Sequence, residues 1–269
     1  MKFVKKICPI IYTGIKIKLK YRDLFKLTKE LELLGEKIIY QINWNYSDLH
    51  FLSVNLLAQN IHKLKSISLL VEKGLSTDAW PLFRSLIENT LDYYYLTKYP
   101  NKVELYFQYA TYLDLKRIKR RIMIMSLSGK KFTDEEEMGL KSLEDEWLRH
   151  KDKFERNGKI RNYWRDKSLI NIAKEAGMEH IYLVGYQEAN DHVHGNSNLI
   201  KMFVRGKNSS GLLLKVGPTY DDPEIVILLG DSAQLFLNIL IFANKTFNLG
   251  FDTILEDKKK IFQMPRKEK

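Results

Sequence analysis

Residues 48–73, DLHFLSVNLLAQNIHKLKSISLLVEK, are the stretch that decides the fold class of this chain. Their apolar side chains recur every three or four residues, which is the spacing of one face of an α-helix. Ser47 and Asp48 are suited to cap the start of this helix, and Gly74 is suited to end it. We therefore expect a long helix with one buried apolar face, made of Leu49, Leu52, Leu56, Leu57, Ile61, Leu64, Ile67, Leu70 and Val71.

Helical patterns continue on both sides of this stretch. Thr77-Asp78 can cap a third helix with Pro81 in its first turn, where proline is tolerated. Thr133-Asp134-Glu135-Glu136 has the form of a capping box, and Asn157-Gly158 should stop the helix that it starts. Further helices are expected at residues 21–45, from Lys102 onward, at 168–176 and 179–194, and from Asp222-Pro223 onward.

The segment between the last two helices is the exception to this pattern. Residues 202–204 and 212–216 could be short strands of a hairpin, and a structured loop is equally compatible with them. We therefore predict an all-α fold, a single multi-helix bundle with a short irregular or β-hairpin-like insertion near 200–220. Its parts would be a basic N-terminal segment (1–22), the helical bundle domain (23–250) and a charged C-terminal tail (251–269).

The net charge of +11 is concentrated at the two ends of the chain. Residues 1–22 carry seven Lys and Arg without an acid, and residues 251–269 carry six against four acids. Terminal charge of this kind can bind polyanions or membrane surfaces without specific recognition. The charge therefore allows RNA as a partner but says little about the function of the bundle.

Cysteine content and hydropathy suggest the compartment. The single Cys8 fits a reducing cytoplasm, and the apolar run at residues 7–12 is too short for a typical export signal. The longest apolar stretch, Ile225–Ala243, approaches the length of a membrane span. Because polar residues recur along it at helical spacing, we expect a buried helix, no integral membrane segment and a cytoplasmic protein. These polar residues are Asp231, Gln234 and Asn238.

The densest cluster of chemically usable groups lies in residues 186–195, YQEANDHVHG. On a helix, Tyr186, Asn190 and His194 would share a face, and Asp191 would neighbour His194 on it, while His192 would point elsewhere. His194 could act as a general acid or base because its ordinary pKa lies near working pH, with Asp191 orienting its ring. It could equally be a histidine that bonds a backbone carbonyl near its helix end.

Arg84 and Glu88 are four residues apart on the third helix, beside its apolar stripe. Since such charges are seldom buried unless paired, they should form an ion pair that fixes helix packing, or share an active site with His194. His192 and His194 diverge by about 200° on a helix, so we expect no metal and no cofactor.

Three residues are candidates for contacts with a substrate. Aromatic rings and arginine can stack on bases, although packing between helices is the more common role of a tryptophan in such a setting. The three are Tyr186, Trp164 and Arg161.

The order of these motifs resembles a bacterial family of helical proteins known only as a domain of unknown function. The resemblance rests on Arg84-x-x-x-Glu88, on Trp164 followed by Ser168, and on Tyr186 with Asp191-x-x-His194-Gly195, and spans residues 50–245.

A second resemblance is to the HEPN class of helical ribonucleases, whose motif is an arginine, a polar residue, a few further residues and a histidine. Asn190 and His194 have a compatible spacing, but Ala189 stands where the motif has arginine, so Arg84 would have to replace it. The resemblance implies metal-independent RNA cleavage, a toxin or phage-defence effector, and a homodimer. The alternatives are a non-catalytic helical interaction module and a small-ligand or metal-binding enzyme.

Overall fold

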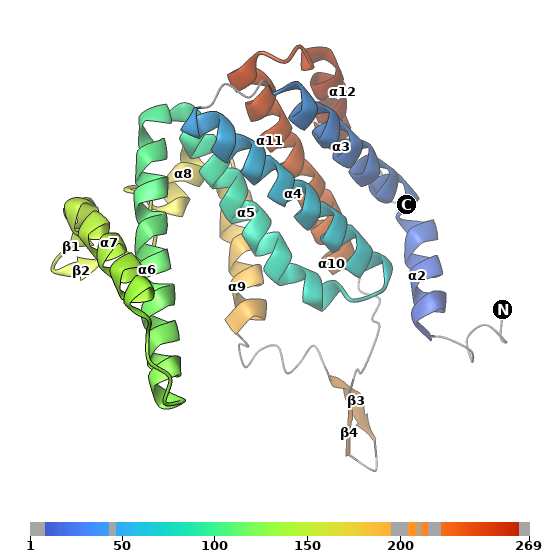
Figure 1. Ribbon diagram of the computed structural model, residues 1–269. Coiled ribbons are helices and arrows are strands. Elements are labelled where there is room, and N and C mark those ends of the chain that lie inside the picture. Colours follow the sequence, from blue (N-terminus) through green and yellow to red (C-terminus); the bar gives the residue numbers. More distant parts are fainter. Residues whose placement is uncertain (1–8, 43–46, 195–203, 209–210, 215–221, 264–269) are drawn as a thin grey trace. The chain divides into compact units, whose positions relative to one another are not determined.

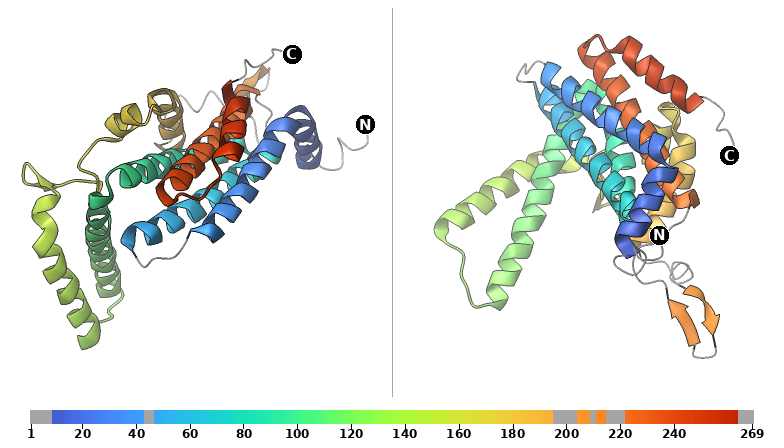
Figure 2. Two further views of the ribbon diagram at one scale, coloured as in Figure 1. Left: turned by 90° about the horizontal axis from the view of Figure 1, so that it is seen from above. Right: turned by 90° about the vertical axis from the view of Figure 1, so that its right-hand side faces the viewer.

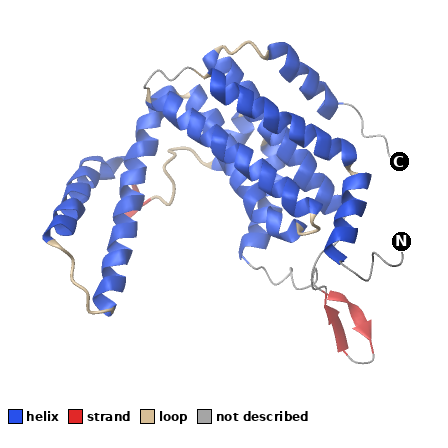
Figure 3. Ribbon diagram, turned by 45° about the vertical axis from the view of Figure 1, so that its right-hand side comes forward, coloured by secondary structure: helices blue, strands red, loops and turns tan. Residues whose placement is uncertain are grey.

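The computed structural model of the protein describes residues 9–42, 47–194, 204–208, 211–214 and 222–263. Nearly all of these residues are helical, and the described strands form two short hairpins (Figure 3). The predicted all-α fold is therefore confirmed.

The chain divides into two compact units, which we describe separately. The first unit is Met1–Lys98 with Leu169–Lys269, and the second is Tyr99–Ser168. The predicted extent of the bundle domain, residues 23–250, stays a prediction. In the second unit the two long helices, α6 Val103–Leu127 and α7 Asp134–His150, pack on each other and form a hairpin.

The first unit is a bundle in which α11 lies against α3, α4 and α5 (Figure 1). The central helix α4 has its predicted start, because the Ser47 side chain accepts a hydrogen bond from the backbone of His50 at 3.3 Å. The helices of the unit are α2 Pro9–Lys20, α3 Arg22–Gln41, α4 Asp48–Glu72, α5 Ser76–Lys98, α8 Leu169–Glu175, α9 Gln187–His194, α10 Asp222–Val226, α11 Ser232–Phe247 and α12 Asp252–Gln263.

Two of these helices lie in the segments that we predicted as terminal tails. α2 falls within residues 1–22, and α12 falls within residues 251–269 and packs on α11 (Figure 2). Leu255 of α12 is 2% exposed, so this charged helix is anchored by an apolar residue that the charge pattern concealed.

Helix α5 begins earlier than predicted, at Ser76. The backbone N–H of Asp78 already bonds the carbonyl of Leu75 at 3.1 Å, so the chain turns before Thr77 can cap it. Pro81 therefore lies inside the helix. Our prediction that it lies in the first turn was wrong.

Two turns of the first unit are π-helical. Ile181–Tyr186 precedes α9, and Ile227–Asp231 joins α10 to α11. A π turn holds more residues than an α turn, and such turns often occur at functional sites. Together α10, the second π turn and α11 form one helix, Pro223–Phe247, that could span a membrane by length and composition alone; 61% of its most apolar window is buried inside the protein. A core helix meets the same criteria.

The second unit consists of α6 Val103–Leu127 and α7 Asp134–His150, followed by a small hairpin. Thr133 and Glu136 form the predicted capping box. The prediction that this helix extends to about Arg156 was wrong. Asn157 and Gly158 have φ values of 53° and 72°, as in a two-residue hairpin turn, and so they join strands instead of stopping a helix. The strands are β1 Glu155–Arg156 and β2 Lys159–Ile160.

The predicted hairpin-like insertion near 200–220 is present as β3 Val204–Asn208 paired antiparallel with β4 Gly211–Leu214. The remaining residues of the predicted strands, 202–203 and 215–216, lie outside the described residues.

Candidate functional site

A close approach of two helical segments in the first unit creates the candidate site. Helix α5 packs against the π turn Ile181–Tyr186 and against α9 (Figure 1). Gly185 permits this approach, because a Cβ atom there would lie 3.0 Å from Cε1 of Phe83. The contacts of Trp80 with His192, and of Glu88 with Tyr186, show that the two segments run antiparallel.

Arg84, Glu88 and Tyr186 form one hydrogen-bonded cluster, here called the Arg84 cluster. The Tyr186 hydroxyl donates to Oε1 of Glu88 at 2.7 Å and accepts from Nη2 of Arg84 at 3.3 Å. Nε of Arg84 lies 3.3 Å from the same Glu88 oxygen, which confirms the predicted ion pair. The Arg84 and Glu88 side chains are 26% and 31% exposed, so the cluster is reached by solvent.

The protonation states of the cluster follow from its surroundings. Burial, together with the bond to Glu88, raises the pKa of Tyr186, so its phenol remains a donor at neutral pH. Burial lowers the pKa of Arg84, but its partners Tyr186 and Glu88 outweigh burial and raise it above its usual value. The cluster therefore holds one cation, one anion and a neutral hydroxyl.

Lys63 of α4 adds a second cation near the cluster. Burial lowers its pKa to about 8, and the negative charges of Glu88 and Asp92 oppose this shift. Its ammonium donates to the carbonyl of Ser85 at 3.5 Å.

His192 of α9 lies deeper, beside the first turns of α5. Its side chain is 1% exposed and stacks on Trp80, with ring centroids 5.0 Å apart and an angle of 14° between the planes. Nε1 of Trp80 donates to the buried Glu224 at 2.6 Å. Glu188 is closest to the ring of His192, with Oε1 3.8 Å from Nε2.

These residues border a cavity of about 230 Å³. Among the described residues, its polar lining consists of Glu188, His192 and Glu224, and Trp80 lines it as well. The other described residues that line it are apolar or glycine, contributed by both π turns and by Pro223.

The structure brings together some of the predicted site residues. Arg84, Glu88 and Tyr186 are in contact, as described above. His194 is exposed at the last residue of α9, and Asn190 and Asp191 are half-buried. Since His194 follows Tyr186 by eight residues, it lies about 12 Å further along the helix axis. Among the described residues no hydrogen bond or ion pair joins His194 to Arg84.

Trp164 and Arg161 belong to the second unit, where neighbours in that unit hold both. Trp164 is 6% exposed and meets the edge of Tyr106 at 5.3 Å between centroids. Nη2 of Arg161 donates to the carbonyl of Lys153 at 2.8 Å. Their contact with a substrate stays a prediction.

Sequence reasoning did not single out His192 as a buried residue. We had placed Tyr186, Asn190 and His194 on one face of the helix and His192 on another. Tyr186 is buried, but the buried face continues along Gly185, Ala189 and His192, whose spacing of four and three residues is the ordinary spacing of a helix interface. The small residues Gly185 and Ala189 on this face could have indicated from the sequence that another helix packs closely against it.

Lys63, Trp80 and Glu224 were also missed as site residues. Lys63 follows the buried Leu56 and Asn60 by seven and three residues, so its half-buried position could have been found from spacing. Glu224 gave no such sign, because its partner Trp80 lies 144 residues away in the chain.

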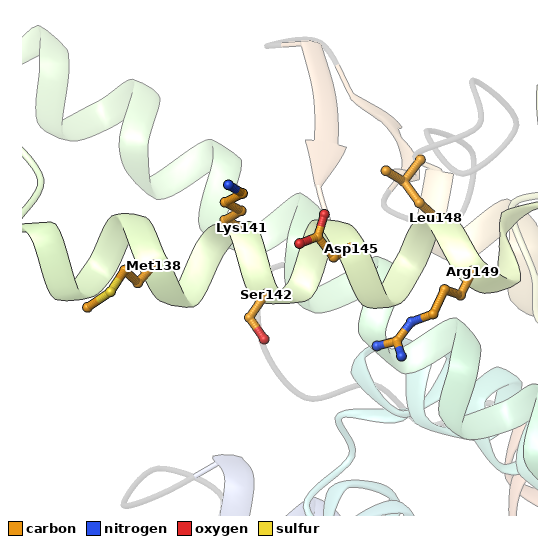
Figure 4. A pocket seen from close by; sticks show the side chains of 6 residues that line it. All are labelled: Met138, Lys141, Ser142, Asp145, Leu148 and Arg149. Carbon is orange, nitrogen blue, oxygen red and sulfur yellow. The ribbon is translucent and has the colours of Figure 1, made fainter.

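Other hollows in the two units give weaker sites. One of about 690 Å³ lies on α7 and is lined by a single helix, whose side chains point in different directions (Figure 4). It therefore has no opposing wall among the described residues. A second, of about 350 Å³, is basic, but Lys18 and Lys29 in it are paired with Glu72 and Glu32. Within the described ranges no three His, Cys, Asp or Glu side chains are placed to hold a metal ion.

The burial of His192 predicts a pH dependence of stability. Burial lowers the pKa of His192, and the charge of Asp191 opposes this. The unfolded chain therefore binds more protons than the folded chain once the pH falls below about 6.5, and stability should fall as the pH drops through that value. In His192→Phe, which keeps a ring against Trp80, this part of the loss should disappear when thermal unfolding is followed from about pH 8 to 5. An unchanged slope in His192→Phe would contradict the assignment.

Comparison with known proteins gives one match. A family model described as "Family of unknown function (DUF5677)" matches residues 50–211, more than half of the chain. This confirms the resemblance to a family known only as a domain of unknown function. Comparisons with curated proteins and with solved structures gave no match. The resemblance to HEPN ribonucleases stays a prediction.

Proposed function

This chain belongs to the DUF5677 family of unknown function, and we propose that it cleaves RNA without a metal ion. The observation that carries the proposal is the Arg84 cluster, which presents an arginine to solvent beside the helix that bears His194. As the resemblance to HEPN ribonucleases implies, the protein would act as a toxin or phage-defence effector and as a homodimer, in the cytoplasm that its single Cys8 fits.

The proposed chemistry is an internal transesterification. The 2′-oxygen of one nucleotide attacks the phosphorus, its proton passes to a base, and the bond to the 5′-oxygen breaks as that oxygen takes up a proton. Arg84 and Lys63 stabilise the negative charge that grows on the phosphate oxygens. His194 acts as the acid or base, with Asn190 and Asp191 preceding it by one turn. Tyr186, which contacts Arg84, and His194 are about 12 Å apart along the helix axis. The side chains of Arg84 and His194, with a phosphate between them, can bridge this separation.

Glu88 and Tyr186 position the arginine in this proposal. The hydrogen bond to Tyr186 and the ion pair with Glu88 fix the orientation of the guanidinium, so its remaining N–H groups can face a phosphate.

A second candidate is a non-catalytic interaction module, in which the same contacts only hold helices together. It is favoured by the fact that Arg84 forms an ion pair with Glu88 and donates a hydrogen bond to Tyr186. A structural ion pair between helices needs no further partner.

Incubation of the purified protein with total RNA in the presence of a chelator tests the proposal. We expect cleavage that resists the chelator and falls at least about 100-fold in His194→Ala, the usual size of an acid–base contribution. His180→Ala is the matched control, because His180 is also exposed and precedes the same helical segment at its other end.

Three outcomes would overturn the proposal: an inactive wild-type protein, cleavage that needs a metal, or full activity in His194→Ala. Loss of cleavage in His180→Ala as well would indicate a general disturbance of the helix, and catalysis by His194 would then have to be abandoned.

A further inference from the structure

Helix α2 turns a row of apolar side chains away from the first unit. Gly14 and Ile17 are buried where α2 packs on α4 and α3, and a Cβ atom at Gly14 would lie 2.7 Å from the carbonyl oxygen of Glu72. Ile15 and Leu19 lie one turn apart on the other side of the helix and are 52% and 74% exposed. The row of Ile15 and Leu19 therefore faces outward at the edge of the unit (Figure 1).

Lysines lie on both sides of this row. Around the helix axis, Lys16 and Lys20 follow the row on one side and Lys18 precedes it on the other, and all three are exposed. The sequence of α2 contains no acid, and residues 1–22 as a whole carry seven Lys and Arg without an acid. Lysines beside an apolar row can hold their ammonium groups at a charged surface while the row enters an apolar layer.

A basic hollow adjoins the row on the side of Lys18. The backbone N–H of Tyr21 bonds the carbonyl of Ile17 at 2.9 Å and so continues the helix from α2 into α3, which places Arg22 next to Lys18. Both residues line the hollow of about 350 Å³ described above. Its other cations, like Lys18, are paired with carboxylates: Lys18 with Glu72, Lys26 with Glu30 and Lys29 with Glu32. Among the described residues Arg22 has no such partner, so it is the cation left to bind an anion.

An anionic lipid surface fits the apolar row and the cations together. Acidic headgroups attract the lysines and Arg22, and the layer beneath the headgroups takes up apolar side chains. An RNA backbone would satisfy the cations but would leave Ile15 and Leu19 in water. The 12 residues of α2 extend over about 18 Å, which is too short to cross a bilayer, so the helix would lie along its surface.

We propose that the exposed face of α2 binds the surface of an anionic lipid bilayer. Ile15 and Leu19 enter the boundary between the headgroups and the acyl chains, and Arg22 binds a lipid phosphate at the rim of the basic hollow. The lysines of α2 stay at the level of the headgroups. This surface is separate from the proposed cleavage of RNA and does not depend on it.

Flotation of the full chain with lipid vesicles tests the proposal. One set of vesicles consists of phosphatidylcholine, and the other of phosphatidylcholine mixed with phosphatidylserine. We expect the mixed vesicles to bind the protein at least about tenfold more tightly, and this binding to weaken as salt is added. Ile15→Ser combined with Leu19→Ser should weaken binding to the mixed vesicles about tenfold, and Arg22→Gln should weaken it about fivefold.

Matched controls come from the second unit. Leu127→Ser combined with Leu148→Ser removes two leucines that are also exposed, and Arg120→Gln removes an exposed arginine; both variants should bind the vesicles as the wild type does.

Four results would overturn the proposal. The first two are absence of binding to the mixed vesicles and equal binding to the neutral ones. The third is unchanged binding in the variant of Ile15 and Leu19, and the fourth is an equal loss in the control variants, which would mean unspecific adhesion. If a short RNA binds the protein and depends on Arg22 while the vesicles do not bind, the basic surface serves RNA and not a membrane.

Discussion

Trp80→Ala should lower the free energy of unfolding by about 3–5 kcal/mol, the cost of removing a large buried aromatic side chain. Trp80 is 2% exposed and contacts Phe83 and His192 through its ring. The substitution also removes the donor that bonds the buried Glu224 at 2.6 Å. Urea unfolding followed by far-UV circular dichroism measures the loss without relying on tryptophan emission.

Trp80→Phe separates the two contributions. It keeps a ring in the same place but removes the N–H, so the loss should be about 1.5–3 kcal/mol, the contribution of a hydrogen bond to a charged group. Tyr40→Ala on α3 is the surface control, because Tyr40 is 88% exposed and should change stability by less than about 0.5 kcal/mol. A loss below about 1 kcal/mol in Trp80→Ala would show that this part of the unit is not packed as described.

Arg84→Ala should destabilise the protein by about 1.5–3 kcal/mol, the range for hydrogen bonds to charged groups. The substitution removes the counter-charge of Glu88 and the donor to Tyr186 together. The loss should stay below the 3–5 kcal/mol of a broken, fully buried pair, because the side chains of Arg84 and Glu88 are about a quarter to a third exposed and water can solvate Glu88. Denaturant unfolding of the single variants and of the double variant Arg84→Met with Glu88→Gln measures this.

The double variant should be more stable than Arg84→Ala, because it leaves no unpaired charge. His194→Ala is the comparison, since an exposed residue at a helix end should be nearly neutral. A loss above about 4 kcal/mol in Arg84→Ala, with none in His194→Ala, would favour the scaffold role of Arg84 and remove the proposed electrostatic partner of His194.

The sequence predicted those features that depend on neighbouring residues. Ser47 starts α4, and Thr133 with Glu136 starts α7, as their local patterns indicate. Gly177, with φ of 68°, ends the short helix α8 as predicted. In each case the chemistry of the cap lies within a few residues of the helix end.

The inward face of the site helix could not be predicted in the same way. It depends on the contact of Gly185 with Phe83, which lies about a hundred residues away in the chain. The π turn before α9 also breaks the regular spacing of 3.6 residues between the chain before Ile181 and the residues of α9. The pairing of Trp80 with Glu224 is likewise tertiary.

The two π turns have a consequence for how this family can vary in chain length. Each holds one residue beyond what an α turn needs, and both border the cavity of His192. Deleting a single residue from Ile181–Tyr186 would let the helix close as an ordinary α-helix and would leave the direction of the later side chains unchanged, because the π turn already accommodates the extra residue. The same deletion from a regular part of the helix would rotate every later side chain by about 100°. His192 would therefore still face Trp80 after a deletion within the π turn, and only the part of the cavity wall that the turn forms would change.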